Sequence, residues 1–104
     1  MFGFLKKMLG GPSVDLGEVI SQGAVIIDVR TPGEYKSGHV KGSVNIPLDK
    51  VSANIDKIKK YNKPIITCCA SGMRSGSAAS ILRKNGLEEV YNGGSWGRVN
   101  NLKR

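Results

Sequence analysis

The sequence predicts an α/β fold in which a mostly parallel sheet carries helices on both faces. Three observations support this prediction. Runs of β-branched residues, such as AVIIDV at 24–29, alternate with segments whose apolar residues recur at helical spacing. Strands separated by helices of this length require right-handed crossovers, which build parallel sheets. The chain has 104 residues, 39% of them hydrophobic and 23% charged, which suits one compact domain.

The first pair of elements is a short helix followed by a buried strand. Asp15 and Glu18 stand three residues apart, as in a capping box, and apolar residues follow at helical spacing, which predicts a helix over 15–22. Gly23 ends it. The run at 24–29 then has the continuous apolar character of a strand that is covered on both faces.

The second pair starts with TPGE at 31–34, which combines a Thr N-cap, Pro at the first helical position and Glu three residues after the cap. This is a strong helix start. Gly38 follows soon, so the helix is expected to be brief. The segment VKGSVNIPL predicts the next strand, at about 43–46.

The rest of the chain continues the alternation. Asp49 is expected to cap a helix with apolar residues at positions 51, 55 and 58, and a buried strand follows Pro64 at 65–68. Helical spacing resumes over 75–84 until Asn85-Gly86 ends the helix. A last strand, EVYN at 89–92, and a closing Gly-Gly-Ser-Trp segment complete the pattern.

Composition narrows the function classes. The net charge is +8, but the basic residues are spread over the chain with few aromatic residues among them, so nucleic-acid binding is not expected. No apolar run is long enough to span a membrane. Residues 1–12 are interpreted as a short amphipathic N-terminal arm, and 13–104 as the single domain. Two adjacent cysteines make a poor disulfide framework, which favours a reducing cytoplasm.

The two cysteines, in IITCCASGMRS at 65–75, are the strongest signal of chemistry. Parallel sheets bind ligands at the carboxyl ends of their strands, and the loop after this strand runs directly into a helix. Its free amides and the helix N-terminus stabilise an anion or a thiolate. Gly72 lets the loop curl, and Arg74 adds a positive fork for an anionic substrate. Cys68, inside the strand, is interpreted as a packed core residue, and Cys69, at the junction, as the nucleophile.

The spacing to the arginine separates two enzyme classes. Five residues lie between Cys68 and Arg74, as in cysteine-dependent phosphatases, but the Gly that this signature requires is Ser71 here. Four residues lie between Cys69 and Arg74, with the glycine in place, and this pattern resembles the active-site loop of the rhodanese family of sulfurtransferases. DVRTPGEYKSGHVKGSVNIPL at 28–48 and LEEVYNGGSW at 87–96 are similar to that family's upstream and closing segments, although the latter is compressed before its tryptophan.

The resemblance implies a rhodanese-like three-layer fold with a five-stranded, mostly parallel sheet, and neither a metal nor an organic cofactor. It implies that Cys69 accepts a sulfane sulfur from thiosulfate or a persulfide and passes it to a thiophilic acceptor, cyanide in vitro or a thiol in the cell. Two half-reactions through one covalent intermediate predict ping-pong kinetics. A sulfur-relay protein is a further candidate partner. The persulfide would lie in a cradle formed by Ala70, Ser71, Gly72, Met73, Arg74 and Ser75.

Other polar residues are interpreted as structural support. Asp28 and Arg30 are expected to form an ion pair or to bond the backbone, and His39 to fix a turn. Glu34 is assigned to the helix cap, and Trp96 either to the core or to a pocket wall.

Three alternatives to sulfur transfer remain open. They are a non-catalytic rhodanese-type binding module, a phosphatase that uses Cys68, and a redox role for the cysteine pair, in which a disulfide between neighbours would be strained. Ala70 and Met73 place apolar side chains where a dedicated thiosulfate enzyme could carry cationic ones, so thiosulfate need not be the natural donor.

Overall fold

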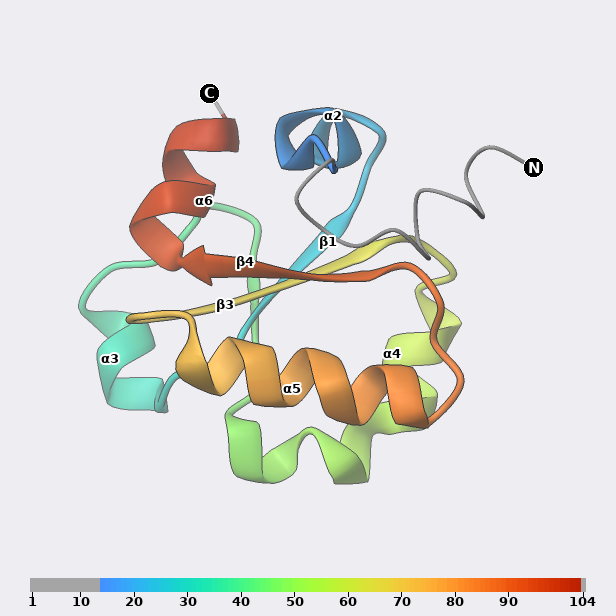
Figure 1. Ribbon diagram of the computed structural model, residues 1–104. Coiled ribbons are helices and arrows are strands. Elements are labelled where there is room, and N and C mark those ends of the chain that lie inside the picture. Colours follow the sequence, from blue (N-terminus) through green and yellow to red (C-terminus); the bar gives the residue numbers. More distant parts are fainter. Residues whose placement is uncertain (1–13, 104) are drawn as a thin grey trace.

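The predicted α/β architecture is confirmed by a computed structural model that describes residues 14–103 (Figure 1). Strands β1 (Val25–Asp28), β2 (Val44–Asn45), β3 (Ile65–Cys69) and β4 (Val90–Ser95) form one parallel sheet in the order β2-β1-β3-β4. The expected arm at 1–12 lies outside the described residues.

The sheet has four strands within residues 14–103, so the expectation of five strands there is wrong. Four runs of residues in this part of the sequence have strand character, and each of them forms a strand. The fifth strand was implied by the family resemblance alone. The segments between the four strands are taken up by helices and tight turns.

Two hydrophobic cores lie on opposite faces of the sheet. Helices α2 (Leu16–Ser21) and α6 (Trp96–Lys103) cover one face, and α4 (Ile55–Lys60) and α5 (Met73–Lys84) cover the other (Figure 1). Because successive side chains of a strand point to opposite faces, Cys68 lies in the α2/α6 core and Cys69 in the α4/α5 core. Each fully buried aliphatic side chain in these cores contributes roughly 1.5–3 kcal/mol.

Local signals explain most helix ends. At α3 (Pro32–Lys36), Thr31 and Glu34 form the predicted reciprocal capping box. At the end of α5, Gly86 has a φ of 99°, and the amides of Gly86 and Leu87 bond to carbonyls of the last turn, as in a Schellman motif. Asp15 caps α2 by accepting the Glu18 amide.

The predicted cap at Asp49 is wrong. Asp49 lies inside the 3-10 helix η2 (Leu48–Lys50), which is followed by a second 3-10 helix, η3 (Ser52–Asn54). The amides of Lys50 and Val51 bond to carbonyls three residues earlier, so the segment winds more tightly than an α-helix. Regular helix begins only at Ile55.

Two more boundaries differ from the predictions. Helix α5 begins at Met73 rather than at 75, because Gly72 occupies the left-handed region at a φ of 103° and serves as the N-cap. Strand β4 runs to Ser95, and the segment after it forms α6 instead of ending the fold. Gly93 makes the close packing of α6 possible: a Cβ there would lie 2.6 Å from Val99 Cγ2 and 2.8 Å from Ile66 Cγ2.

Candidate active site

The candidate site lies where β3 ends and the loop of residues 70–72 leads into α5 (Figure 1). Gly72 is the residue that turns the chain there. Its positive φ is strained for any other residue, and a Cβ at this position would lie only 3.3 Å from Gly94 Cα. The loop therefore curls closely against the end of β4, over the side chain of Cys69.

The Cys69 sulfur lies at the centre of the curl. Sγ accepts the amide of Gly72 at 3.0 Å and that of Ser75 at 3.4 Å, and the Ser75 hydroxyl oxygen lies 3.4 Å away. Burial acts to raise the pKa of this thiol, but the Ser75 hydroxyl and the amides of Ser75, Gly72 and Ser71 outweigh it, so the pKa is lowered. A lowered thiol pKa makes the nucleophilic thiolate more available.

Cys68 has a contrasting environment on the other face of the sheet. It is buried among apolar side chains that include Ile26, Val40 and Val99. Desolvation, and then the neighbouring Asp28 carboxylate, raise the pKa of its thiol to about 12, although Arg30 acts in the opposite direction. A thiol in this environment stays protonated and unreactive at neutral pH.

Arg74 is engaged by an acidic partner that the sequence did not indicate. Its two terminal nitrogens donate to Glu34 Oε1 at 2.8 Å and Glu34 Oε2 at 3.0 Å, which makes a bidentate ion pair. Glu34 Oε1 also accepts the amide of Thr31 in the capping box. Arg74 first and then Thr31 lower the pKa of Glu34 to about 2. Glu34 thus has the expected capping contacts and, in addition, holds the guanidinium of the candidate anion-binding residue.

The loop rim, formed by Ala70, Ser71 and Met73, is more exposed than the Cys69 side chain. Ala70 and Ser71 are exposed, Met73 is 80% exposed, and Cys69 has no exposed surface. The hydrogen-bonding partners of the sulfur are instead the backbone amides of Gly72 and Ser75 and the hydroxyl of Ser75.

Asp28 and Arg30 form a buried ion pair with a distance of 2.7 Å between Arg30 Nη2 and Asp28 Oδ2. Arg30 also donates to the carbonyls of Glu34 and Gly38, and its guanidinium lies 4.8 Å from the centre of the Trp96 ring. These contacts tie α3, the following turn and the start of α6 to the end of β1. None of them reaches Cys69.

His39 lies in the turn after α3 and is exposed. Its Nδ1 is 2.7 Å from the carbonyl oxygen of Tyr35, and the two rings are stacked with centroids 3.7 Å apart. The Tyr35 hydroxyl in turn donates to the carbonyl of Ser43. The histidine is thus fixed by local contacts of the turn.

Asn92 is a contributor that sequence reasoning missed. From β4, its Oδ1 accepts the Ser75 hydroxyl at 2.6 Å and the Gly94 amide at 3.0 Å, and its Nδ2 donates to the Gly72 carbonyl at 3.1 Å. No spacing or motif in the sequence signals the contacts with Ser75 and Gly72, because those residues lie 17 and 20 positions from Asn92.

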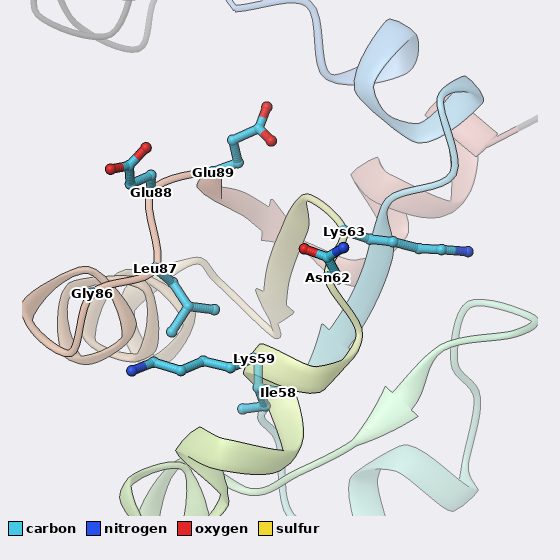
Figure 2. Close-up of a pocket in the computed structure, with 8 residues that line it drawn as sticks. All are labelled: Ile58, Lys59, Asn62, Lys63, Gly86, Leu87, Glu88 and Glu89. Carbon is cyan, nitrogen blue, oxygen red and sulfur yellow. The ribbon is translucent and has the colours of Figure 1, made fainter.

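A separate cavity of about 450 Å³ opens at the opposite end of the sheet (Figure 2). It is lined by the residues that precede β3 and β4, among them Lys59, Lys63, Glu88 and Glu89. Cysteines are absent from this lining. Among residues 14–103, no group of three His, Cys, Asp or Glu side chains could hold a metal ion, and no helix is long and apolar enough to cross a bilayer.

Comparison with known proteins gives consistent matches. A family model described as rhodanese-like domain matches residues 5–96. The chain is 45% identical over 69 residues to YqhL of Bacillus subtilis, 40% over 67 residues to thiosulfate sulfurtransferase GlpE of Pseudoalteromonas translucida, and 39% over 69 residues to thiosulfate sulfurtransferase PspE of Escherichia coli. These matches cover 66%, 64% and 65% of this chain, respectively. They span only 54%, 63% and 66% of the length of those relatives.

Solved structures also resemble the fold, among them the two that follow. An E. coli rhodanese with anions has a TM-score of 0.66 at 36% identity, with 72% of this chain and 89% of that chain covered. A human single-domain sulfurtransferase, TSTD1, has a TM-score of 0.69 at 25% identity, with 91% and 99% covered.

Proposed function

Because the chain belongs to the rhodanese-like domain family, we propose that it is a sulfurtransferase whose nucleophile is Cys69. The observation that supports this most is the set of amide donors around Sγ, which favours a negatively charged sulfur at this point. The names of GlpE and PspE identify those relatives as thiosulfate sulfurtransferases. We extend that activity to this chain as a proposal.

The proposed reaction has two steps. The Cys69 thiolate attacks the outer sulfur of thiosulfate or of another sulfane-sulfur donor. With thiosulfate the S–S bond of the donor breaks, and sulfite leaves with the bonding electron pair, so that a Cys69 persulfide remains. Cyanide or a thiol then attacks the outer sulfur, and the Cys69 thiolate is regenerated. The amides that bond Sγ are placed to stabilise negative charge in both steps.

The charge distribution suits an anionic donor. The chain carries a net charge of +8, which raises the local concentration of anions near its surface. Arg74 supplies a guanidinium beside the loop, but both of its terminal nitrogens already donate a hydrogen bond to Glu34. A donor anion therefore either shares Arg74 with Glu34 or displaces that carboxylate. The donor enters on the exposed side of the loop, at Ala70 and Ser71.

The proposed setting follows from the same chemistry. Both cysteines are free, which suits a reducing compartment such as the cytoplasm. The acceptor in the cell is proposed to be a thiol, carried either by a small molecule or by a protein of a sulfur relay.

Intact mass spectrometry tests the proposal. The reduced protein is incubated with thiosulfate, freed of excess donor and weighed, and cyanide is then added, for the wild type, Cys68→Ser and Cys69→Ser. We expect the wild type and Cys68→Ser to gain one sulfur atom that cyanide removes as thiocyanate, and Cys69→Ser to gain none. If no variant gains sulfur from thiosulfate or from a persulfide donor, the chain is a binding module and not an enzyme of this class.

A further inference from the structure

Asn92 has an amide orientation that its partners determine. A backbone N–H can only donate, so the atom facing the Gly94 amide at 3.0 Å is the oxygen Oδ1. A backbone carbonyl can only accept, so the atom facing the Gly72 carbonyl at 3.1 Å is the nitrogen Nδ2. The two contacts agree and leave one arrangement of this side chain.

This orientation directs the single proton of the Ser75 hydroxyl. Because Oδ1 of Asn92 can only accept, the 2.6 Å contact with Ser75 Oγ uses that proton. The lone pairs of Ser75 Oγ are then free toward Cys69, whose sulfur lies 3.4 Å away. In this state Ser75 accepts a hydrogen bond from the neutral thiol, and it can lower the pKa of Cys69 only when it turns its own proton to the thiolate.

We propose that Asn92 is a positioning residue that competes with the Cys69 sulfur for the Ser75 hydroxyl proton and thereby sets how readily the thiolate forms. When the thiolate forms, the hydroxyl must turn from Asn92 to Sγ, which breaks its 2.6 Å bond to Oδ1. The inference rests on the proposed role of Cys69 as the nucleophile. It adds a residue that touches neither the sulfur nor the donor.

The packing of Asn92 against α5 supports a specific role for its side-chain amide. Gly76 lies inside α5, where glycine costs about 1 kcal/mol relative to alanine. A Cβ at this position would lie 3.1 Å from Asn92 Nδ2. The absence of a side chain at residue 76 thus makes room for the Asn92 amide to reach over the first turn of α5 to the Gly72 carbonyl.

The experiment measures the pH dependence of Cys69 alkylation by iodoacetamide, in a Cys68→Ala background so that one thiol is present. Asn92→Ala frees the Ser75 proton for the thiolate, and we expect the apparent pKa of Cys69 to fall by about half a unit to one unit, the worth of one neutral hydrogen bond. Ser75→Ala removes the proton itself. In that background Asn92→Ala should produce no further shift.

A merely structural role of Asn92 predicts a different result. Loss of its bond to the Gly72 carbonyl would loosen the loop, so Asn92→Ala would raise the apparent pKa, and would do so with or without Ser75. That result, or the absence of any shift, overturns the inference. Asn54→Ala is the matched control, because Asn54, in η3, is a partly buried asparagine whose side-chain amide donates to a backbone carbonyl at 2.8 Å. It should leave the profile unchanged.

Gly76→Ala is a second variant that keeps Asn92 and displaces only its amide. Because alanine favours the helix, the variant should fold, and we expect a smaller shift of the apparent pKa in the same direction as for Asn92→Ala. A rise would count against the inference. Alkylation needs no sulfur donor, so these results are independent of the sulfur-loading test. If no variant gains sulfur in that test but the alkylation pKa shifts as predicted, the proposed enzyme activity is refuted while the role of Asn92 stands.

Discussion

Cys68 and Cys69 are neighbours in β3 and equally buried, with no exposed surface on either. The pKa values of their thiols are nevertheless shifted in opposite directions. Cys68 lies under α2 and α6 among apolar side chains and beside a carboxylate, which together raise its pKa to about 12. Cys69 lies under the loop that starts α5, and hydrogen bonds from Ser75 and from loop amides lower its pKa against the effect of burial.

The comparison teaches that burial alone does not decide the reactivity of a cysteine. Desolvation is the first cause at both positions and acts in the same direction. The difference comes from hydrogen-bond donors, which lower the pKa of Cys69, and from the Asp28 carboxylate, which raises that of Cys68. Strand alternation produces the contrast, since one residue step moves a side chain from one face of the sheet to the other.

The largest expected effect comes from Asp28→Asn, which breaks the ion pair on the Cys68 side. Arg30 is 5% exposed and Asp28 is 0% exposed, so the variant leaves a buried guanidinium without its counter-charge. We expect a loss of about 3–5 kcal/mol in the free energy of unfolding. Urea unfolding followed by circular dichroism measures it. A loss below 1 kcal/mol would mean that water reaches this pair and that the Cys68 side is not a closed environment.

Gly93→Ala tests the packing of the same side. The new methyl group would lie 2.6 Å from Val99 Cγ2 and 2.8 Å from Ile66 Cγ2, so it must displace α6 or β3. We expect destabilisation of about 1–3 kcal/mol. Gly97→Ala is the control, because nothing lies within 4 Å of a Cβ at that position in α6, and it should stabilise by up to about 1 kcal/mol. Equal unfolding midpoints for the two variants would contradict this account.

Ser75→Ala tests the environment of Cys69. It removes the hydroxyl that most lowers the pKa of Cys69, so that pKa should rise. The rise should be about half a unit to one unit, and alkylation near neutral pH should slow accordingly. The pH profile of iodoacetamide alkylation checks it. If the midpoint stays in place, the backbone amides alone account for the environment of Cys69.

Glu34→Gln is expected to have the smallest effect, visible mainly in acid. The pKa of Glu34 is lowered from 4.5 to about 2, so its ion pair and cap stabilise the fold above pH 4.5, and this contribution disappears as the pH falls toward 2. Glutamine can still accept the Thr31 amide but carries no charge, so the variant lacks the ion pair and its pH dependence at every pH. Unfolding free energies at pH 6 and pH 3 should therefore differ less for Glu34→Gln than for the wild type, and an unchanged difference would argue against the pair.

The sequence predicted the fold well where local signals were strong. The TPGE cap, the β-branched runs and the Asn85-Gly86 helix end depend on near neighbours, and each forms the predicted feature. Asp49 misled because it precedes an apolar pattern of helical spacing, while the chain there winds as 3-10 helix. Helix α6 was missed because its sequence, WGRVNNLK, has few apolar residues and only Val99 is buried.

The sequence predicted the loop that surrounds the candidate nucleophile, but not the side-chain contacts that hold this loop in place. The placement of Cys69 at the end of a parallel strand, together with Gly72, was enough to expect amides aimed at its sulfur. The contacts of Glu34 with Arg74 and of Asn92 with Ser75 join residues 40 and 17 positions apart. Such pairs depend on how the elements pack, and spacing in the sequence carries no signal for them.

The double use of Glu34 has a consequence for how the chain can evolve. Replacement of Arg74 removes the ion pair but leaves Glu34 in its capping box with Thr31. Replacement of Glu34 removes its side-chain half of the capping box and the partner of Arg74 in one step, although Thr31 can still accept the backbone amide of residue 34. The two positions therefore differ as steps of divergence. A lineage that loses the arginine first keeps the complete capping box, whereas a lineage that loses the glutamate first loses the ion pair and one of the two bonds of that box.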